Sequence, residues 1–260
     1  MLLWGFGVSW FISFLSTSCF LNTILINIIL RNDKWREKLK KIPVVIFGVS
    51  GHAKVILDII ESGNSYELLG FIDNETPIGT NILGYKVLGN DPSLPKLMEE
   101  YNFNKGIIGI GDNFIRSKVA NFVGELVPNF QFVNCIHPSA NISKHCQLGH
   151  GNVIMAGVSI NLSVKISDHC ILNTNSSLDH DCCMGNYSCL APNSVVGGNT
   201  RIGDYSYIGI GCTVFHNIEI GRNCIVGGGS LIIRDTSSDS VFFGSPAKFI
   251  SSRILGDKYL

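Results

Sequence analysis

The chain contains 260 residues, enough for one large domain or two modest ones with a substantial hydrophobic core. Its 20 basic and 20 acidic residues cancel, so no global field attracts a polyanion, and a nucleic acid is not an expected partner. The 28 glycines and a charged fraction of only 15% indicate many tight turns and a large buried surface.

Residues 1–38 form an apolar leader with a basic end. The stretch 1–30 contains no charged side chain and is long enough for a membrane-spanning helix. The segment "RNDKWREKLKK" follows with six basic and two acidic residues, which would keep that flank on the cytoplasmic side. No basic region precedes the apolar run, so a cleavable signal peptide is not indicated. We expect a cytoplasmic protein that residues 1–30 tether to the inner face of the membrane. The alternative is a translation start at Leu39, in which case the leader is not part of the protein.

Residues 39–133 alternate short apolar runs with amphipathic stretches. Strands are expected at 43–48, 67–73 and 105–111, and helices at 52–63 and 115–126. Strands that alternate with helices indicate an α/β domain with a parallel sheet and right-handed crossovers.

Residues 134–237 follow a different rule. Every sixth residue from Ile136 to Ile232 is Ile, Leu, Val or Met, which makes seventeen hexads without a break. The fifth position of a hexad is Ala, Cys, Ser or Thr in thirteen of the seventeen. This is the hexapeptide pattern of a parallel β-helix, in which three hexads make one triangular coil. Residues 238–260 break the period and are expected to cap the open end of the β-helix.

The repeat also accounts for most of the nine cysteines. A cysteine at the fifth position behaves as a small hydrophobic residue. Five cysteines occupy it: Cys146, Cys170, Cys182, Cys212 and Cys224. A redox role for the pair at 182–183 is therefore weakly indicated.

One histidine of the repeat has acidic neighbours on both sides. His180 is third in its hexad and lies between Asp179 and Asp181. A neighbouring carboxylate can orient an imidazole and keep its pKa near neutrality, so His180 is a candidate general base. The alternative is a solvated histidine at a corner of the coil.

Residues one coil apart should form a column along the β-helix, about 4.8 Å per step. The column of His180 runs through Leu162, His180, Gly198, His216 and Arg234. Because Gly198 has no side chain, we expect a gap beside His180 that a thioester carbonyl can enter, facing exposed backbone.

A zinc site is the competing interpretation of the histidines. His145 and His150 are spaced as in β-helix zinc enzymes that resemble gamma-class carbonic anhydrase. Such a site needs a third histidine about two coils away. The corresponding positions here are Gly109 and Asp181, so no metal is expected.

Two motifs carry a family resemblance: the loop "GVSGH" at 48–52 and the segment "NTNSSLDHDC" at 173–182. With the hexads between 134 and 237, they resemble the NeuD/PglD group of hexapeptide-repeat acetyltransferases. The resemblance runs from about residue 40 to 250 and leaves the leader out. It implies a Rossmann-like N-terminal domain that binds a sugar nucleotide, followed by a left-handed parallel β-helix that carries the acetyltransferase site.

The resemblance assigns residues of three loops to the sugar nucleotide. Glycines in the first loop would bring backbone N–H groups to a phosphate at the start of a helix, and an acidic residue after the second strand would meet the ribose or base. Ordinary turn chemistry is the alternative for all three loops. The residues are Gly48, Ser50, Gly51 and His52, then Asp73 and Asn74, then Gly111 and Asp112.

In the β-helix, the resemblance makes His180 the general base, Asp181 its acidic partner and Asn173 a contact on the substrate side. Gly198 would lie against the acetyl thioester, with Ile210 and the segment 244–248 along the pantetheine arm of acetyl-CoA. His216 would be structural or contact this ligand. Cys189 stands nine residues after the base, where the family commonly has a histidine near the acetyl group.

These observations predict an acyltransferase that acetylates the amine of a nucleotide-linked amino sugar with acetyl-CoA as cosubstrate. In the family, such enzymes act in surface glycan and polysaccharide biosynthesis and work as homotrimers with each site between two β-helices. Two alternatives stay open: O-acetylation of a sialic-acid-like sugar, and an inactive β-helix subunit that only binds a sugar nucleotide.

Overall fold

The computed structural model describes residues 41–258. Residues 43–258 belong to one compact unit. Within the described residues, no helix has the length and apolar character needed to cross a membrane. The leader at 1–38 and the tether predicted for it lie outside the described part of the chain.

The first part of the chain is built on a six-stranded sheet with the order β3-β4-β2-β1-β5-β6. Pairs β2·β4, β1·β5 and β5·β6 are parallel, and β3·β4 is antiparallel. β1 lies between β2 and β5, so the chain order reverses between β1 and β5. The elements are β1 (Ile42–Phe47), α2 (Gly51–Ser62), β2 (Tyr66–Ile72), β3 (Asn81–Ile82), β4 (Tyr85–Gly89), a 3₁₀ turn (Asp91–Ser93), α3 (Leu94–Tyr101), β5 (Lys105–Ile108), α4 (Asn113–Leu126) and β6 (Gln131–Phe132).

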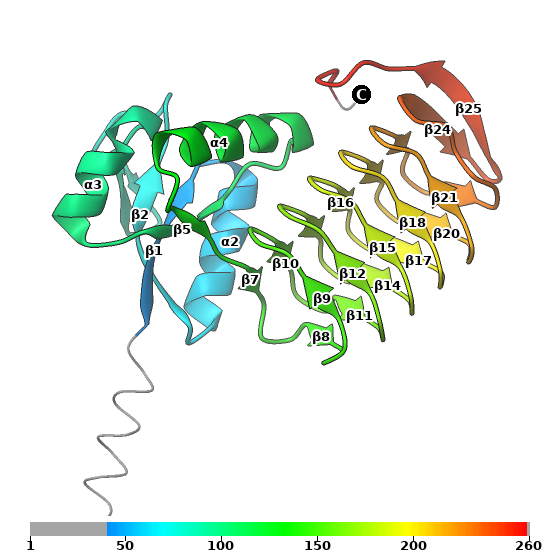
Figure 1. Cartoon of the computed structure of the whole chain (residues 1–260), viewed down its shortest axis with the longest axis horizontal. Coiled ribbons are helices and arrows are strands. Elements are labelled where there is room, and N and C mark those ends of the chain that lie inside the picture. Colours follow the sequence, from blue (N-terminus) through cyan, green and yellow to red (C-terminus); the bar gives the residue numbers. More distant parts are fainter. Residues whose placement is uncertain (1–40, 259–260) are drawn as a thin grey trace, which may run out of the picture. The chain divides into compact units, whose positions relative to one another are not determined.

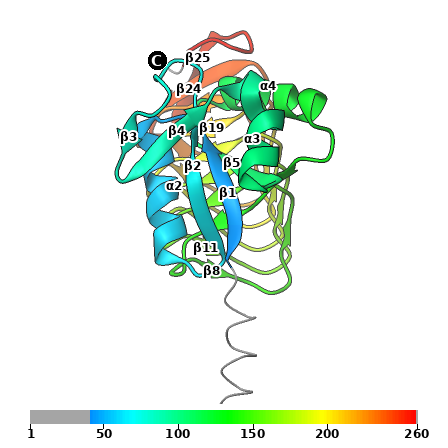
Figure 2. The ribbon, with the colours of Figure 1, turned by 90° about the vertical axis from the view of Figure 1, so that its left-hand side faces the viewer.

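The helices cover both faces of this sheet (Figure 2). α2 packs its buried Ile56 and Ile60 on one face, while Leu97 of α3 and Val123 of α4 are buried on the other. The two helices and three strands expected from the sequence are present as α2, α4, β1, β2 and β5. α3, β3, β4 and β6 were not predicted, because each is short and lacks a long apolar period.

The second part is a parallel β-helix of seventeen two-residue strands (Figure 1). Each strand ends on the aliphatic residue of a hexad, and until the last coil each pairs with the strand one coil further along the chain, as Leu178 does with Val196. The strands are β7 (Cys135–Ile136), β8 (Asn141–Ile142), β9 (Gln147–Leu148), β10 (Val153–Ile154), β11 (Ser159–Ile160), β12 (Lys165–Ile166), β13 (Ile171–Leu172), β14 (Ser177–Leu178), β15 (Cys183–Met184), β16 (Cys189–Leu190), β17 (Val195–Val196), β18 (Arg201–Ile202), β19 (Tyr207–Ile208), β20 (Thr213–Val214), β21 (Glu219–Ile220), β22 (Ile225–Val226) and β23 (Leu231–Ile232). The hexapeptide β-helix predicted from the sequence is thus confirmed.

The strands form three sheets along the β-helix. The first sheet has the order β25-β24-β22-β19-β16-β13-β10-β7, the second β23-β20-β17-β14-β11-β8, and the third β21-β18-β15-β12-β9. The aliphatic residues of the hexads pack together inside, and cysteines such as Cys182 and Cys212 fill the corners. All eight cysteines in the described residues are free thiols.

Three corners join the sheets in each coil: the first corner leads from the first to the second sheet, the second corner to the third sheet, and the third corner back to the first. The fourth residue of most hexads has a left-handed backbone, with φ between about 50° and 71°. Asn, Asp and Gly tolerate this conformation best. Asp181 occupies it at the second corner, with φ 59°.

Three bulky rings occupy this left-handed position at the third corner. His169, Tyr187 and Tyr205 stack with ring centroids 5.1 and 5.2 Å apart. Phe132 meets His169 edge-on at 4.8 Å. The strain of left-handed backbone at bulky residues is therefore offset by contacts between the β-helix and the α/β part.

Arg116 of α4 joins the α/β part to this column. Its side chain is buried and donates five hydrogen bonds of 2.7–3.1 Å. Three go to the loop after β5 and to Asn113, and two go to the backbone carbonyls of His169 and Tyr187. One side chain thus holds the loop after β5 and two coils of the β-helix together.

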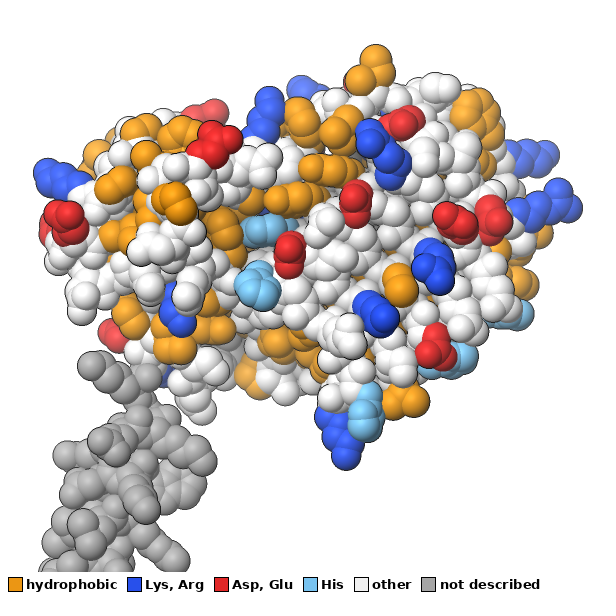
Figure 3. All heavy atoms as spheres, viewed as in Figure 1, with side chains coloured by type: hydrophobic (Ala, Val, Ile, Leu, Met, Phe, Trp, Pro, Cys, Tyr) orange, Lys and Arg blue, Asp and Glu red, His pale blue; other side chains and the backbone are white. Residues whose placement is uncertain are grey.

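The chain ends with a hairpin of β24 (Ser240–Gly244) and β25 (Ala247–Ser252). β24 pairs with β22 in parallel and so extends the first sheet, while β25 returns antiparallel to β24. The side chains of Phe242 and Ala247 pack against the interior of the last coils. Charged side chains of both signs are scattered over the β-helix face seen in Figure 3, without forming one patch.

Candidate active site

His180 lies at the second corner, directly after β14. Its Nδ1 is 2.8 Å from Oδ2 of Asp181, and its backbone N–H donates to Oδ1 of Asp179 at 2.8 Å. The left-handed backbone of Asp181 places that carboxylate beside the ring of its own neighbour. With Nδ1 engaged, Nε2 is the ring nitrogen left for a substrate.

Asp179 is itself fixed by the preceding coil. Asn161 donates to its Oδ1 at 2.8 Å. This hydrogen bond and the one from the His180 backbone lower the pKa of Asp179, so it stays ionised. Asn161 and Asp179 are one coil apart in the sequence and belong to one column of the second corner, which is why the repeat brings them together.

The two carboxylates set the protonation of His180. The hydrogen bond to Asp181, followed by the charge of Asp179, raises the pKa of His180 above its ordinary value of 6.5. The imidazole side chain is 50% exposed, so solvent screens this effect and a proton can reach the ring. A half-exposed histidine with one nitrogen anchored to a carboxylate is suited to accept a proton at the other nitrogen.

Gly198 lies one coil beyond His180. A Cβ atom at this glycine would be 2.7 Å from both Cε1 and Nε2 of His180. The gap expected from the sequence is therefore present, but the imidazole itself lies over it, so it is not an empty slot for a carbonyl. Among residues 41–258, the Gly198 N–H makes no hydrogen bond, so this backbone donor is not used within the chain.

Replacing Gly198 with alanine is expected to lower kcat for the reaction at His180 about 10²-fold. The backbone of Gly198 is not left-handed, so the added methyl acts through its collision with the ring rather than through backbone strain. Initial rates of the variant would be compared with those of Gly124→Ala, where the added Cβ meets nothing within 4 Å. Equal rates for the two variants would contradict this account.

Asn173, expected on the substrate side, and the residues expected at the acetyl-CoA site are spread over different corners of the β-helix. His216 is exposed two coils beyond His180, with its ring 6.3 Å from that of Phe215. Asn173 and Ile210 both lie at the first corner, where Asn173 Oδ1 accepts from Thr174 N at 2.8 Å and Ile210 is 59% exposed. Within one chain, Asn173 and His180 therefore lie at different corners.

Cys189 does not lie where the sequence suggested. It is 4% exposed on the outer side of the first sheet, in a hydrophobic cluster with residues of α2. Burial raises the pKa of its thiol to about 12. The spacing of nine residues from His180 places this position on another sheet, so within this chain Cys189 does not meet the base and acts as a core residue.

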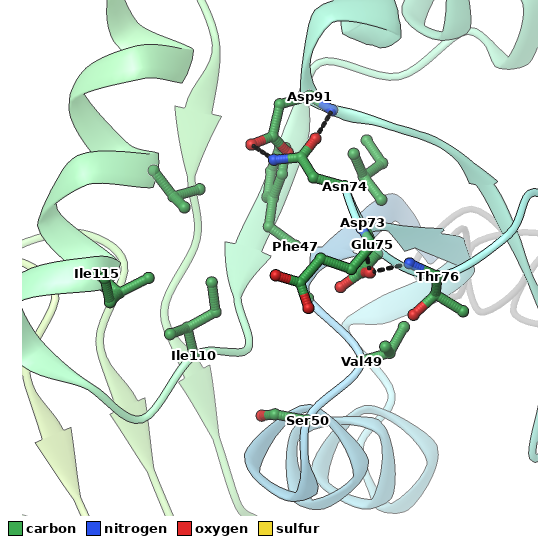
Figure 4. A pocket seen from close by; sticks show the side chains of 13 residues that line it. Phe47, Val49, Ser50, Asp73, Asn74, Glu75, Thr76, Asp91, Ile110 and Ile115 are labelled. Atoms are coloured by element: carbon green, nitrogen blue, oxygen red, sulfur yellow. Dashed lines mark hydrogen bonds between the residues drawn. The ribbon is translucent and has the colours of Figure 1, made fainter.

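A cavity of about 400 Å³ opens beside the α/β sheet, where the strand order reverses between β1 and β5 (Figure 4). Cavities at this point of a parallel sheet commonly bind nucleotides. Its lining residues come from the loops after β1, β2, β4 and β5 and from α4: Phe47, Gly48, Val49, Ser50, Ile72, Asp73, Asn74, Glu75, Thr76, Asp91, Ile110, Ile115 and Val119.

Four residues expected at the sugar nucleotide line this cavity. Gly48 has a φ of 93°, and a Cβ there would be 3.0 Å from Ile110. The Ser50 hydroxyl caps α2 and donates to the Gly109 carbonyl at 2.7 Å. Asp73 accepts from the backbone of residues 75 and 76, and Asn74 bonds to Asp91. Glycine and capping chemistry therefore shape the entrance to the cavity.

The other four do not line it. Asp112 caps α4 by accepting from Ile115 N at 2.8 Å, and the Gly111 carbonyl accepts from Arg116. Gly51 begins α2. The ring of His52 is turned inward, with Nε2 buried and without a hydrogen-bond partner, and burial lowers the pKa of His52 to about 4. Asp112 thus has the helix-capping role that ordinary turn chemistry would give it.

Several residues of interest were not found from the sequence. Glu75, Thr76 and Asp91 line the cavity, and Arg116 fixes the loop after β5. A signal for Arg116 was available, because a lone basic residue stands on the buried face of the helix expected at 115–126.

A second cavity, of about 300 Å³, lies at the end of the β-helix. Arg234, the last residue of the His180 column, lines it together with Lys248 of the segment 244–248. Two cations, the one carboxylate of Asp235 and the apolar Phe242 and Phe249 give this cavity a net positive, partly apolar lining. It can hold a phosphorylated ligand with an apolar part.

No group of three or more His, Cys, Asp or Glu side chains within 41–258 is arranged to hold a metal ion. His145 and His150, the pair considered for zinc, both lie exposed, and His150 is 4.0 Å from Asp168.

Comparison with protein families gives two matches. Residues 43–123 match the family model of the PglD N-terminal domain, and residues 199–234 match that of the bacterial transferase hexapeptide repeats.

The relatives of this chain include N-acetyltransferases that are named for nucleotide-linked sugars. The X-ray structure of PerB from Caulobacter crescentus, in complex with CoA and GDP-perosamine, is 34% identical with a TM-score of 0.75, covering 80% of this chain and 97% of that one. A GDP-perosamine N-acetyltransferase of Escherichia coli O157:H7 is 26% identical over 59% of this chain and 69% of its own length. A UDP-N-acetylbacillosamine N-acetyltransferase of Bacillus subtilis (strain 168) is 33% identical over 44% and 51%.

Proposed function

Because the chain belongs to the PglD-type family of hexapeptide-repeat acetyltransferases, we propose that it transfers an acetyl group from acetyl-CoA to the amine of a nucleotide-linked amino sugar. The observation that carries this proposal is the His180–Asp181 pair beside the Gly198 backbone on the β-helix. The α/β part of the same chain adds a cavity large enough for a nucleotide. The relatives named above act on GDP- and UDP-linked amino sugars, which supports the same class of acceptor here.

The chemistry follows from the geometry of His180. Nε2 of the neutral ring takes a proton from the acceptor nitrogen as that nitrogen attacks the thioester carbonyl. The C–N bond forms, the C–S bond breaks, and His180 returns the proton to the departing CoA thiolate. Asp181 holds the ring through Nδ1 and stabilises the imidazolium, and the Gly198 N–H is the candidate donor to the developing oxyanion. No acetyl-enzyme is required.

The cavity at Arg234 and Lys248 supports a position for the phosphorylated end of acetyl-CoA. Arg234 is three coils from His180 in the same column, about 14 Å away at ordinary strand spacing. The pantetheine arm would run along the second corner, past His216, from this cavity to Gly198.

A homotrimer is proposed on the character of the three sheets. The third sheet exposes Lys165, Arg201 and Glu219, and residues of α2 pack on the first. The second sheet presents only uncharged side chains outward, namely Asn141, Ser159, Ser177, Val195, Thr213 and Leu231. Such a surface suits packing against copies of the same chain. First-corner residues such as Asn173 and Ile210 of one copy would then approach His180 of the next.

The finer parts of the sequence-based description stay predictions. These are the Rossmann-like character of residues 39–133, the left hand of the β-helix at 134–237, the cap at 238–260, a cytoplasmic location and a role in surface glycan synthesis. The acyl acceptor is proposed as an amine rather than a sialic-acid hydroxyl because the relatives are N-acetyltransferases.

The test is acetylation of a panel of acceptors. The purified chain would be incubated with acetyl-CoA and GDP- or UDP-linked amino sugars, or with sialic-acid-type sugars, and the products identified by mass spectrometry. Acetylation of a nucleotide amino sugar is expected. Acetylation only of a sialic-acid hydroxyl would support the O-acetyltransferase alternative, and nucleotide binding without any product would support the inactive subunit.

The pH dependence of the reaction should report the Asp181 contact. Because the general base must be neutral, kcat/KM should rise with pH through the raised pKa of His180. Asp181→Asn removes the largest cause of that rise, so the acidic limb should move to lower pH, toward the ordinary histidine value. Rate profiles between pH 5 and 9 would check this. If the acidic limb of the kcat/KM profile did not move, the group that titrates there would not be His180.

A further inference from the structure

The nucleotide cavity has an acidic lining. Among residues 41–258, its lining contains the three acidic residues Asp73, Glu75 and Asp91 and no lysine or arginine. A diphosphate cannot be held by carboxylates, so its place is the N-terminus of α2, where backbone N–H groups of the first helical turn favour an anion. The Gly48 N–H does not contribute, because it donates to the Ile72 carbonyl at 2.8 Å. The carboxylates must then meet hydrogen-bond donors of the ligand, which are the ribose hydroxyls and the N–H groups of the base.

The carboxylates lie at different distances from the phosphate end. In Figure 4, Ser50 marks the start of α2 at one end of the cavity, and Asp91 lies at the other, beyond Asp73 and Glu75. Ile110, Ile115 and Val119 give the cavity an apolar wall, with Ile115 and Val119 on one face of α4. The flat face of a nucleobase can pack against these side chains while the polar edge of the base points toward Asp91.

One carboxylate oxygen of Asp91 remains available to accept a hydrogen bond from a ligand. It is only 7% exposed, its Oδ2 accepts from Asn74 Nδ2 at 2.7 Å, and its backbone N–H donates to Asn74 Oδ1 at 3.0 Å. Its other carboxylate oxygen has no partner within residues 41–258. Asp91 as a residue is more than nine-tenths buried, and its carboxylate is oriented by Asn74 and borders a cavity, so it is a ready acceptor for ligand N–H groups.

The hydrogen-bonding edge of each base decides which one suits a carboxylate. Guanine presents two adjacent donors, N1–H and the 2-amino group, which match carboxylate acceptors. Uracil presents a single N3–H between two carbonyl oxygens, and those oxygens would face the carboxylate charge. We infer that Asp91 reads the nucleobase of the sugar nucleotide and selects guanine over uracil. This inference rests on the proposed function, because it names the substrate class of the same site.

The Asn74–Asp91 pair also ties the loop after β2 to the start of the 3₁₀ turn after β4, so a purely structural role has to be separated from base recognition. Asp91→Asn does this. The amide can still accept from Asn74, but it offers the ligand a donor beside an acceptor. That pattern matches xanthine, whose 2-oxo group replaces the 2-amino group of guanine. A structural role predicts no exchange of base preference.

Isothermal titration calorimetry of the full chain would measure GDP, UDP, inosine diphosphate and xanthosine diphosphate. GDP should bind about tenfold or more tightly than UDP, and inosine diphosphate, which lacks the 2-amino group, should be weaker than GDP by a similar factor. Asp91→Asn should weaken GDP about tenfold or more and strengthen xanthosine diphosphate. Asp58→Asn, the same change on an exposed position of α2, should alter none of them.

Equal binding of GDP and UDP to the unaltered chain would overturn the inference, as would an equal loss of all ligands in Asp91→Asn. The inosine comparison needs no mutation, so the inference stays testable if that variant does not fold. Preference for UDP together with acetylation of a UDP-linked amino sugar would refute guanine selection and leave the proposed function standing. Binding of none of the four nucleotides would count against the proposed function itself.

Discussion

Replacing His180 with asparagine is expected to lower kcat by about 10²–10⁴-fold, with a much smaller change in KM. Asparagine keeps much of the shape and can still hydrogen-bond Asp181, but its amide does not take up a proton near neutral pH. The acceptor nitrogen would then lose its proton without help as it attacks the thioester. Because the ring is half-exposed and few contacts are lost, a folding defect should contribute little to the change in kcat.

The measurement is initial rates of product formation by mass spectrometry, which avoids thiol reagents in a chain with nine cysteines. His145→Asn is the matched control, since His145 is exposed at the same corner two coils earlier and meets no acidic partner among residues 41–258. It should leave kcat unchanged. If His180→Asn retained the activity of this control, the proton would have to leave by another route and the proposed mechanism would be wrong.

Replacing Arg116 with methionine is expected to reduce the free energy of unfolding by about 3 kcal/mol or more. Methionine fills a similar volume, but it leaves the carbonyls of Ile110, Gly111, His169 and Tyr187 without their donor inside the protein. Each unsatisfied buried acceptor costs about 1–3 kcal/mol, and relaxation recovers part of the sum. At about 2–4 °C per kcal/mol for a chain of this size, Tm should fall by roughly 6 °C or more.

Thermal unfolding followed by circular dichroism would measure this change. Arg222→Met is the matched control, because Arg222 forms a surface pair with Asp239 at 3.7 Å and its side chain is 58% exposed. Surface pairs contribute about 0–1 kcal/mol, so Tm of the control should hardly move. Equal shifts for the two variants would show that Arg116 does not join the α/β part to the β-helix.

The position of His180 could be predicted because the repeat is strictly periodic. Once three hexads make a coil, the order along the chain places His180, Gly198 and His216 in one column and brings Asn161 to Asp179. The contact between His180 and Asp181 is between neighbours in sequence, so it too could be anticipated. The ring position over Gly198 could not, since it depends on a side-chain torsion.

The cavity beside the α/β sheet was predicted less completely. Gly48 and Ser50 belong to a local loop whose chemistry a short motif reveals. Asp91 comes from a separate loop further along the chain from Asn74, and the two meet only because β2 and β4 are neighbours in the sheet. Strand order is a long-range property, and neither residue carries a local signal for it.

Periodicity, apolar spacing and short-range contacts act between residues close in sequence, so the hexapeptide β-helix, helices α2 and α4 and the His180–Asp181 pair can be read from the chain alone. The burial of Cys189, the inward turn of His52, the capping role of Asp112 and the five hydrogen bonds of Arg116 were decided only in three dimensions. Each depends on which surfaces the α/β part and the β-helix present to each other. The residues that make this contact are far apart in the sequence. Their burial and their hydrogen bonds exist only once both parts have folded.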